Sequence, residues 1–175
     1  MRYAPFAIAA ALGLATVSTV GHSQRPDAQL DPVSVELLRK GEAAQKAGEL
    51  NAAVDLFETA LAVDPRNRAA FVALGDVAKA QGLPGKAIRL YREALELEPN
   101  DLQALSGQGD ALVQKGAVTK ARENLAKIKS LCGDACPEEA RLAASIAKGP
   151  PAAVQSAQVA TKAPAPGEEA SRERD

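Results

Sequence analysis

The chain has 175 residues, a formal net charge of −1, one histidine and two cysteines. This length allows one domain, and the near-neutral charge, with no cluster of Lys or Arg, argues against nucleic-acid binding. The scarcity of histidine and the lack of a glycine-rich phosphate loop argue against an enzyme.

Residues 1–23 have the pattern of an export signal. Arg2 gives a basic start, the run that continues to Leu14 is almost entirely small or apolar, and Gly21 and Ser23 have the spacing that signal peptidase prefers. We therefore expect a cleaved signal peptide and a periplasmic or secreted protein. The alternative is an uncleaved segment that anchors the chain to the inner membrane, although the apolar run is short for a span.

After a linker at residues 24–30, the chain shows an internal repeat with a period of 34 residues. Seven series of positions keep this register, and such agreement indicates three copies of one structural unit. The series are Gly41, Gly75 and Gly109; Gly48, Gly82 and Gly116; Ala53, Ala87 and Ala121; Leu37, Phe71 and Leu105; Phe57, Tyr91 and Leu125; Ala60, Ala94 and Ile128; and Pro65, Pro99 and Gly133.

Each unit has the pattern of a pair of helices. Apolar and small residues recur at helical spacing, as in Phe71, Leu74, Gly75 and Ala78, and predict one buried face. The second glycine series lies where a first helix should end, since glycine tolerates the left-handed conformation just past a helix. We expect the proline series to end the second helices and Asp31, Asn67 and Asp101 to cap the helices that follow them.

The aromatic residues after the signal segment are Phe57, Phe71 and Tyr91. All three occupy repeat positions where a bulky core residue is expected, so we predict that they pack in the core. The alternative is that they line a ligand pocket.

These positions resemble the tetratricopeptide repeat family, whose pattern is W-x2-L-G-x2-Y…A-x3-F…P. The repeats would be residues 34–67, 68–101 and 102–135, and the second matches best. The first departs from the pattern at Lys40, and the third departs at Gln108 and lacks the closing proline. The resemblance implies an all-α fold, a right-handed superhelical solenoid of three helix-turn-helix repeats.

Residues 137–148 predict a further helix that caps the third repeat. Pro137 and the acidic Glu138 and Glu139 are typical of a first turn, and Leu142 and Ile146 share one face. We therefore place the folded domain at residues 31–148. Residues 149–175, rich in Ala, Pro and charges, have no apolar period and predict a disordered tail.

Cys132 and Cys136 flank the junction between the third repeat and the capping helix. In an oxidising compartment two cysteines this close are expected to form a disulfide, and Gly133 makes the tight turn feasible. Free thiols remain an alternative, and so does a metal or catalytic role. A zinc site would need two more ligands, and the only histidine, His22, is expected to leave with the signal. This cysteine pair, in the form L-C-G-x-x-C, resembles the cysteine pairs of repeat proteins of bacterial envelopes.

The family resemblance also implies a binding site, because the first helix of each repeat lines a concave groove in such proteins. Its clamp for a terminal carboxylate uses asparagines and lysines, whereas the matching central positions here hold Glu42, Asp76 and Asp110. We therefore expect partners that present Lys or Arg, with a merely solvated face as the alternative. The candidate groove residues are Leu38, Arg39, Glu42, Gln45, Lys46, Val72, Asp76, Lys79, Gln103, Ser106, Asp110, Val113 and Gln114.

The sequence thus predicts an exported, non-enzymatic adaptor that binds a partner peptide or helix in this groove. The alternative is a structural subunit of an envelope assembly that associates through its convex face or an open end of the solenoid. We expect no catalytic residue, cofactor, metal or small-molecule substrate, and no membrane span after signal cleavage. Helical carboxylates such as Asp55 and Glu58 are interpreted as a solvated face rather than an acid/base pair.

Overall fold

The structure is a computed structural model that describes residues 30–132 and 136–156. The predicted signal peptide, nearly all of the predicted linker and residues 157–175 of the predicted tail lie outside the described residues.

The described residues form helices and no strand. Each expected repeat contributes two helices, and one more follows the third repeat. The helices are α1 (Pro32–Lys46), α2 (Leu50–Val63), α3 (Arg68–Ala80), α4 (Pro84–Leu97), α5 (Leu102–Gln114), α6 (Val118–Cys132) and α7 (Pro137–Lys148).

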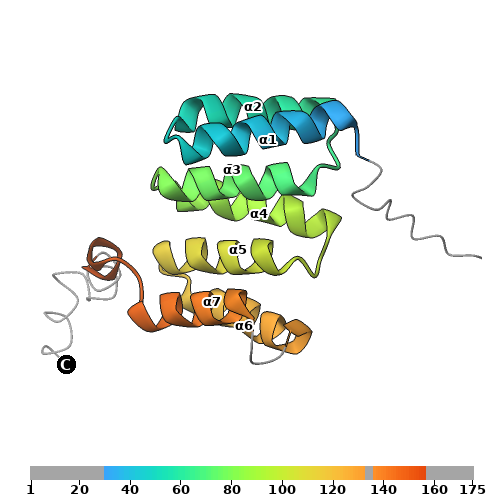
Figure 1. Ribbon diagram of the computed structural model, residues 1–175. Coiled ribbons are helices and arrows are strands. Elements are labelled where there is room, and N and C mark those ends of the chain that lie inside the picture. The colour runs from blue at the N-terminus through green and yellow to red at the C-terminus, as the bar shows by residue number, and fades with distance from the viewer. Residues whose placement is uncertain (1–29, 133–135, 157–175) are drawn as a thin grey trace, which may run out of the picture.

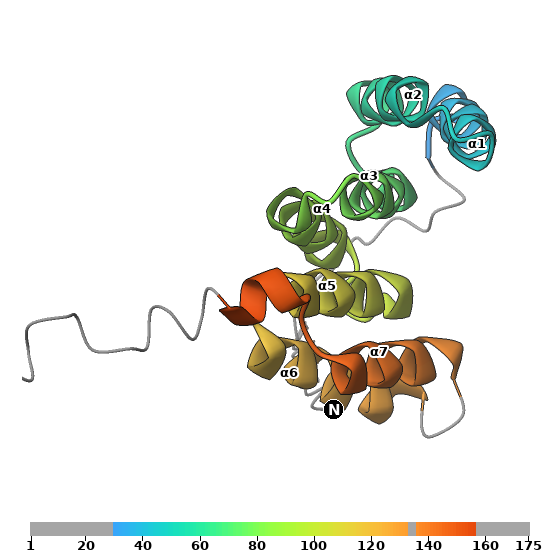
Figure 2. The same cartoon turned by 90° about the vertical axis from the view of Figure 1, so that its left-hand side faces the viewer.

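The helices stack as antiparallel pairs, α1 with α2, α3 with α4 and α5 with α6, and α7 lies against the last pair (Figure 1). Seen from the end, α1, α3, α5 and α7 lie along one side of the stack and α2, α4 and α6 along the other (Figure 2). The arrangement confirms the expected all-α solenoid of three helix pairs with a C-terminal capping helix.

The pairs close on aromatic side chains that fit against glycines. A Cβ atom at Gly41 would lie 2.4 Å from the Phe57 ring, and one at Gly75 would lie 2.8 Å from the Tyr91 ring. Both rings are completely buried, and Phe71 packs against the Tyr91 cluster while partly exposed. The predicted core role of the three aromatic residues is confirmed.

The first helix of each pair ends at a glycine with positive φ, as the sequence predicts. After α3, Gly82 has a φ of 71°, and the backbone N–H groups of Gly82 and Leu83 donate to the carbonyls of Lys79 and Ala78. These hydrogen bonds satisfy carbonyl groups that the helix end would otherwise leave without partners. Gly48 and Gly116 end α1 and α5 in the same left-handed conformation.

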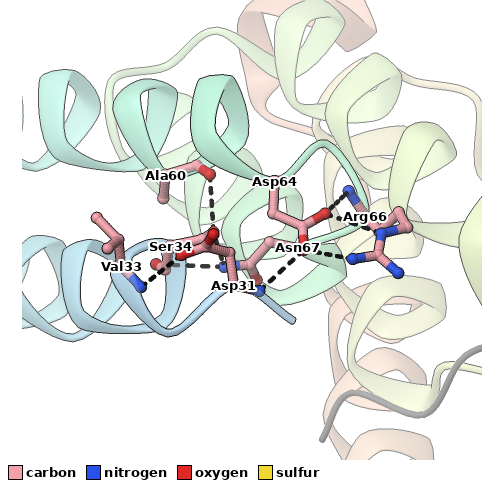
Figure 3. Close-up of polar contacts among 7 residues, drawn as sticks. All are labelled: Asp31, Val33, Ser34, Ala60, Asp64, Arg66 and Asn67. Carbon is pink, nitrogen blue, oxygen red and sulfur yellow. Dashed lines mark hydrogen bonds and ion pairs between the residues drawn. The ribbon is translucent and has the colours of Figure 1, made fainter. Parts of the chain in front are cut away.

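Polar side chains join the start of α1 to the end of α2 and the start of α3 (Figure 3). The buried Ser34 hydroxyl donates to the Ala60 carbonyl at 2.7 Å and accepts from the Asn67 amide at 2.8 Å. Asp64 accepts the backbone N–H of Asp31 at 3.0 Å and pairs with Arg66 at 2.8 Å. The hydrogen bonds from the Arg66 side chain and from the Asp31 backbone hold the pKa of Asp64 at about 2.

The next junction places equivalent residues in the same roles. Asn67 and Asp101, 34 residues apart, accept backbone N–H groups at the first turns of α3 and α5, and Asp31 does so for α1. The three predicted N-caps are thereby confirmed. At the first junction Asn67 donates a hydrogen bond to Ser34. At the second junction the equivalent positions hold Asp101 and Arg68, which form an ion pair instead.

Helix α7 covers the third pair through Leu142, which is completely buried and would contact a Cβ atom added at Gly109. Ile146 packs against the same part of the core. Within the predicted tail, residues 152–156 form a short helical segment. Pro151 at its start and the alanines that follow favour a helix, and the Val154 N–H donates to the Pro151 carbonyl at 2.9 Å.

Candidate functional site

A groove of about 460 Å³ opens along the first helices of the three repeats. Side chains of α1 and α3 form most of it, and α5 adds one residue. The lining residues are Glu42, Gln45, Lys46, Arg68, Ala69, Val72, Ala73, Asp76 and Gln103.

The core packing explains why these side chains face the groove. On α3, Gly75 lies against the Tyr91 ring of α4. Ala78 belongs to the same core cluster as Tyr91. Residues spaced by three and four on a helix share a face, so Ala69, Val72 and Asp76 follow one line along α3. Within this line Val72 is 3% exposed and still belongs to the Tyr91 cluster at the floor of the groove. On α1, Gly41 meets Phe57, while Glu42, Gln45 and Lys46 line the groove.

The candidate acidic row does not consist of three free carboxylates. The Lys79 ammonium lies 3.6 Å from an Asp76 oxygen and 3.4 Å from an Asp110 oxygen, and so links α3 to α5. The Tyr91 hydroxyl also donates to Asp76 Oδ1 at 2.7 Å. Burial, with the nearby Asp76 carboxylate, raises the pKa of the Tyr91 hydroxyl far above its ordinary value, so it remains a donor.

These contacts correct the expected charge of the groove. Asp76 and Asp110 share the single cation Lys79, which offsets one of their two negative charges, and Asp110 is not among the lining residues. Glu42 is exposed and lines the groove, but Lys46 and Arg68 line it as well. The groove therefore has a mixed charge, and the prediction of an open row of three carboxylates is wrong.

The structure brings together six of the thirteen predicted groove residues, namely Glu42, Gln45, Lys46, Val72, Asp76 and Gln103. Two others are buried by the capping helix or beside it. Ser106 is fully buried and its hydroxyl donates to the Glu138 carbonyl of α7 at 3.3 Å. Val113 is 3% exposed and belongs to a cluster against which Ile146 packs. Their placement in an open groove is wrong, because α7 occupies that side of the third repeat.

The remaining candidates lie near the groove without lining it. Leu38 packs against the core cluster around Phe57, and Arg39 pairs with Glu36 on the exposed surface. Lys79 is engaged with the two aspartates, and Gln114, at the end of α5, is half-buried.

Sequence reasoning missed Arg68, Ala69 and Ala73 as lining residues. Arg68 lies one turn before Val72 on the same helical face, and this spacing could have identified it. Ala69 and Ala73 give no chemical signal, since alanine is equally common in the packed faces of this chain. Arg68 also forms the ion pair with Asp101, so its guanidinium is held at the groove wall.

Cys132 and Cys136 lie as a pair between the end of α6 and the start of α7, with a Cα–Cα distance of 6.1 Å. In the described part of the chain, no group of His, Cys, Asp and Glu side chains is arranged to bind a metal ion. Within the same residues, every helix is too short or too polar to cross a membrane.

Stacked helix pairs closed by a capping helix define an α-helical repeat protein. The sequence matches the tetratricopeptide repeat family over residues 38–83 and 72–140, and the chain belongs to this family. Members of the family are generally non-enzymatic modules of protein interaction. No curated protein sequence matches the chain.

Solved structures show the same fold. The first TPR domain of Spaghetti (RPAP3), bound to the HSP90 peptide SRMEEVD, is 18% identical with a TM-score of 0.62, covering 66% of this chain and 91% of that one. The Sgt2 TPR domain from Aspergillus fumigatus is 24% identical, with a TM-score of 0.62 and coverage of 77% and 87%. An O-GlcNAc transferase mutant from Thermobaculum terrenum is 25% identical with a TM-score of 0.60, but the match covers 65% of this chain and only 22% of that one.

Proposed function

We propose that this protein is an exported adaptor that holds a partner peptide or helix in the groove formed by α1, α3 and α5. The observation that carries the proposal is that first helices of all three repeats contribute side chains to one open groove of about 460 Å³. A segment that lies across several repeats makes contacts that no single helix pair offers.

The chemistry of the groove suits a peptide. Ala69 gives apolar surface above the buried Val72 and Ala73, and the amides of Gln45 and Gln103 can both donate to and accept from a peptide backbone. Among the similar structures, the Spaghetti domain was solved with a peptide bound. Since this groove carries charges of both signs, we expect its partner to present both acidic and basic groups rather than Lys and Arg alone.

Export is supported by the N-terminal sequence, with Arg2, an apolar run and small residues at the expected cleavage positions. N-terminal sequencing of the protein from its native host should find a mature start near Gln24. Recovery of the chain with Met1 retained would contradict cleavage and favour the membrane-anchored alternative.

Filling the groove tests the binding site directly. Ala69 lines the groove and Ala62 is an exposed alanine of α2 outside it, so Ala69→Phe and Ala62→Phe form a matched pair. We expect capture from the envelope fraction of the native host, measured by quantitative mass spectrometry, to lose its specific partners with Ala69→Phe and keep them with Ala62→Phe. Circular dichroism and melting curves check that both variants are folded. Equal capture by both folded variants would contradict the groove as the site.

A second candidate is a structural subunit that associates through its convex face or open end. It is favoured by the exposed apolar residues of α1, where Val33 is 58% and Val35 is 45% exposed. In that case partner recovery survives Ala69→Phe and is lost with Glu58→Arg on α2 or with Val33→Asp at the open end.

A further inference from the structure

A second hollow, of about 720 Å³, lies at the edge of the second repeat, where the turn between α3 and α4 meets the residue that follows α5. Figure 1 shows this turn and the end of α5 in the middle of the stack. Its charged lining is entirely basic: Lys86, Arg89 and Arg92 come from α4, and Lys115 follows α5. Leu83 and Ile88 give it apolar surface. We call this surface the basic hollow.

The four cations of the basic hollow form no ion pair with any described residue. Some other cations are paired, as Lys79 is with Asp76 and Asp110 and as Arg68 is with Asp101. Isolated cations such as Lys120 and Arg122 are not paired with any residue that the structure describes. Four unpaired charges of one sign around a concave surface produce a local positive potential, which attracts anionic groups. The net charge of the chain is −1, so the potential is a property of this surface alone.

The repeat fold does not require these cations. The positions of α2 that lie 34 residues before Arg89 and Arg92 hold Asp55 and Glu58, so the same helical face is acidic in the first repeat. Both Arg89 and Arg92 are exposed, and neither belongs to the buried core. Their charge therefore needs an explanation other than folding.

The apolar part of the hollow indicates what kind of anionic partner fits. Leu83 is 47% exposed at the start of α4, and Ile88 is partly buried against two core clusters. Exposed apolar surface ringed by cations complements a peptide that alternates carboxylates and apolar side chains. Nucleic-acid bases stack most strongly on aromatic rings, and no aromatic side chain lines the hollow.

We propose that the basic hollow binds an acidic segment of a partner protein, through Lys86, Arg89, Arg92 and Lys115, with an apolar side chain of that segment against Leu83 and Ile88. This surface is separate from the groove, with which it shares no lining residue. The protein would then hold two partner segments at once, one in the groove and one at the edge of the second repeat.

The test uses the full chain and a short fluorescent peptide in which Glu and Leu alternate. A control peptide has Gln in place of every Glu. We expect the acidic peptide to bind, the control peptide to bind at least about tenfold more weakly, and salt raised from about 0.05 M to about 0.5 M to weaken the acidic peptide.

The variant Arg89→Glu/Arg92→Glu should lose at least about tenfold in affinity for the acidic peptide. The matched variant Arg39→Glu/Arg122→Glu makes the same change in net charge at exposed positions outside the hollow and should retain the affinity. The groove-filling Ala69→Phe should also retain it, which separates this proposal from the one for the groove. Equal losses in the two charge variants would overturn the proposal.

Two other results would also overturn the proposal, because each would show that the hollow has a different occupant. If light scattering shows a dimer that Arg89→Glu/Arg92→Glu dissociates, the hollow receives a second copy of the chain, for which the acidic face of α2 is available. If removal of residues 157–175 raises the affinity for the acidic peptide about tenfold, the chain's own C-terminal segment competes for the hollow.

Discussion

Tyr91 contacts both the core of the second repeat and the polar groups beside the groove. Its ring fills the space left by Gly75 and Gly107, and its hydroxyl donates to Asp76 at the edge of the groove. The Lys79 ammonium lies 5.9 Å from the ring centroid and also contacts Asp76 and Asp110. One side chain thus connects the packing of the helix pair to the polar groups beside the binding surface.

The glycine that faces Tyr91 gives a prediction at this scale. Gly75→Ala places a Cβ atom 2.8 Å from a ring that is completely buried, so we expect a loss of stability of about 1–3 kcal/mol. Urea denaturation followed by circular dichroism measures it.

Gly85→Ala is the matched control, because Gly85 is also helical and nothing lies within 4 Å of an added Cβ atom there. This variant should be unchanged or more stable by up to about 1 kcal/mol. Equal effects of the two substitutions would mean that Gly75 does not face the ring.

At the scale of elements, the junction of α1, α2 and α3 depends on a carboxylate. The pKa of Asp64 is about 2, below the value of 3.8 that applies in an unfolded chain. Between these values the unfolded state binds more protons, so the stabilisation by Asp64 is complete above about pH 5 and is lost as the pH falls towards 2.

We therefore expect Asp64→Asn to lower the melting temperature at pH 7, and this difference from the wild type to shrink as the pH falls from about 5 to about 2. Thermal melts over this pH range provide the measurement. Asp55→Asn, an exposed carboxylate of α2, is the control and should show little effect at any pH. A difference for Asp64→Asn that stays constant with pH would contradict the role given to the charged Asp64.

Much of each element could be predicted from the sequence, because its causes are local. The glycines that end α1, α3 and α5, the caps Asn67 and Asp101 and the core aromatics all follow from spacing along the chain. The groove was predictable only in part. Spacing shows which residues share a face but not what covers it, so the burial of Ser106 by α7 was missed. The link from Lys79 to Asp110 joins two repeats and depends on how one is rotated against the next.

For the whole molecule, the capping helix determines whether the third repeat is stable. Leu142 is completely buried between α5 and α6, and the Cys132–Cys136 pair lies where the cap joins α6. We expect Leu142→Ala to cost about 2–5 kcal/mol, through lost burial and a cavity. Denaturation in urea measures the loss.

Leu131→Ala makes the same chemical change at a side chain that is 40% exposed, and should cost about 0.5 kcal/mol or less. If the two substitutions proved equally mild, α7 would not serve as a cap.

The central claim is that the groove, and not the convex face, holds a partner. A photo-crosslinking amino acid placed at Gln103, in the groove, and separately at Arg122, on the exposed surface of α6, tests it in cells of the native host. We expect ultraviolet light to yield a specific covalent adduct with a partner protein from position 103 and none from position 122. Adducts from position 122 alone would contradict it.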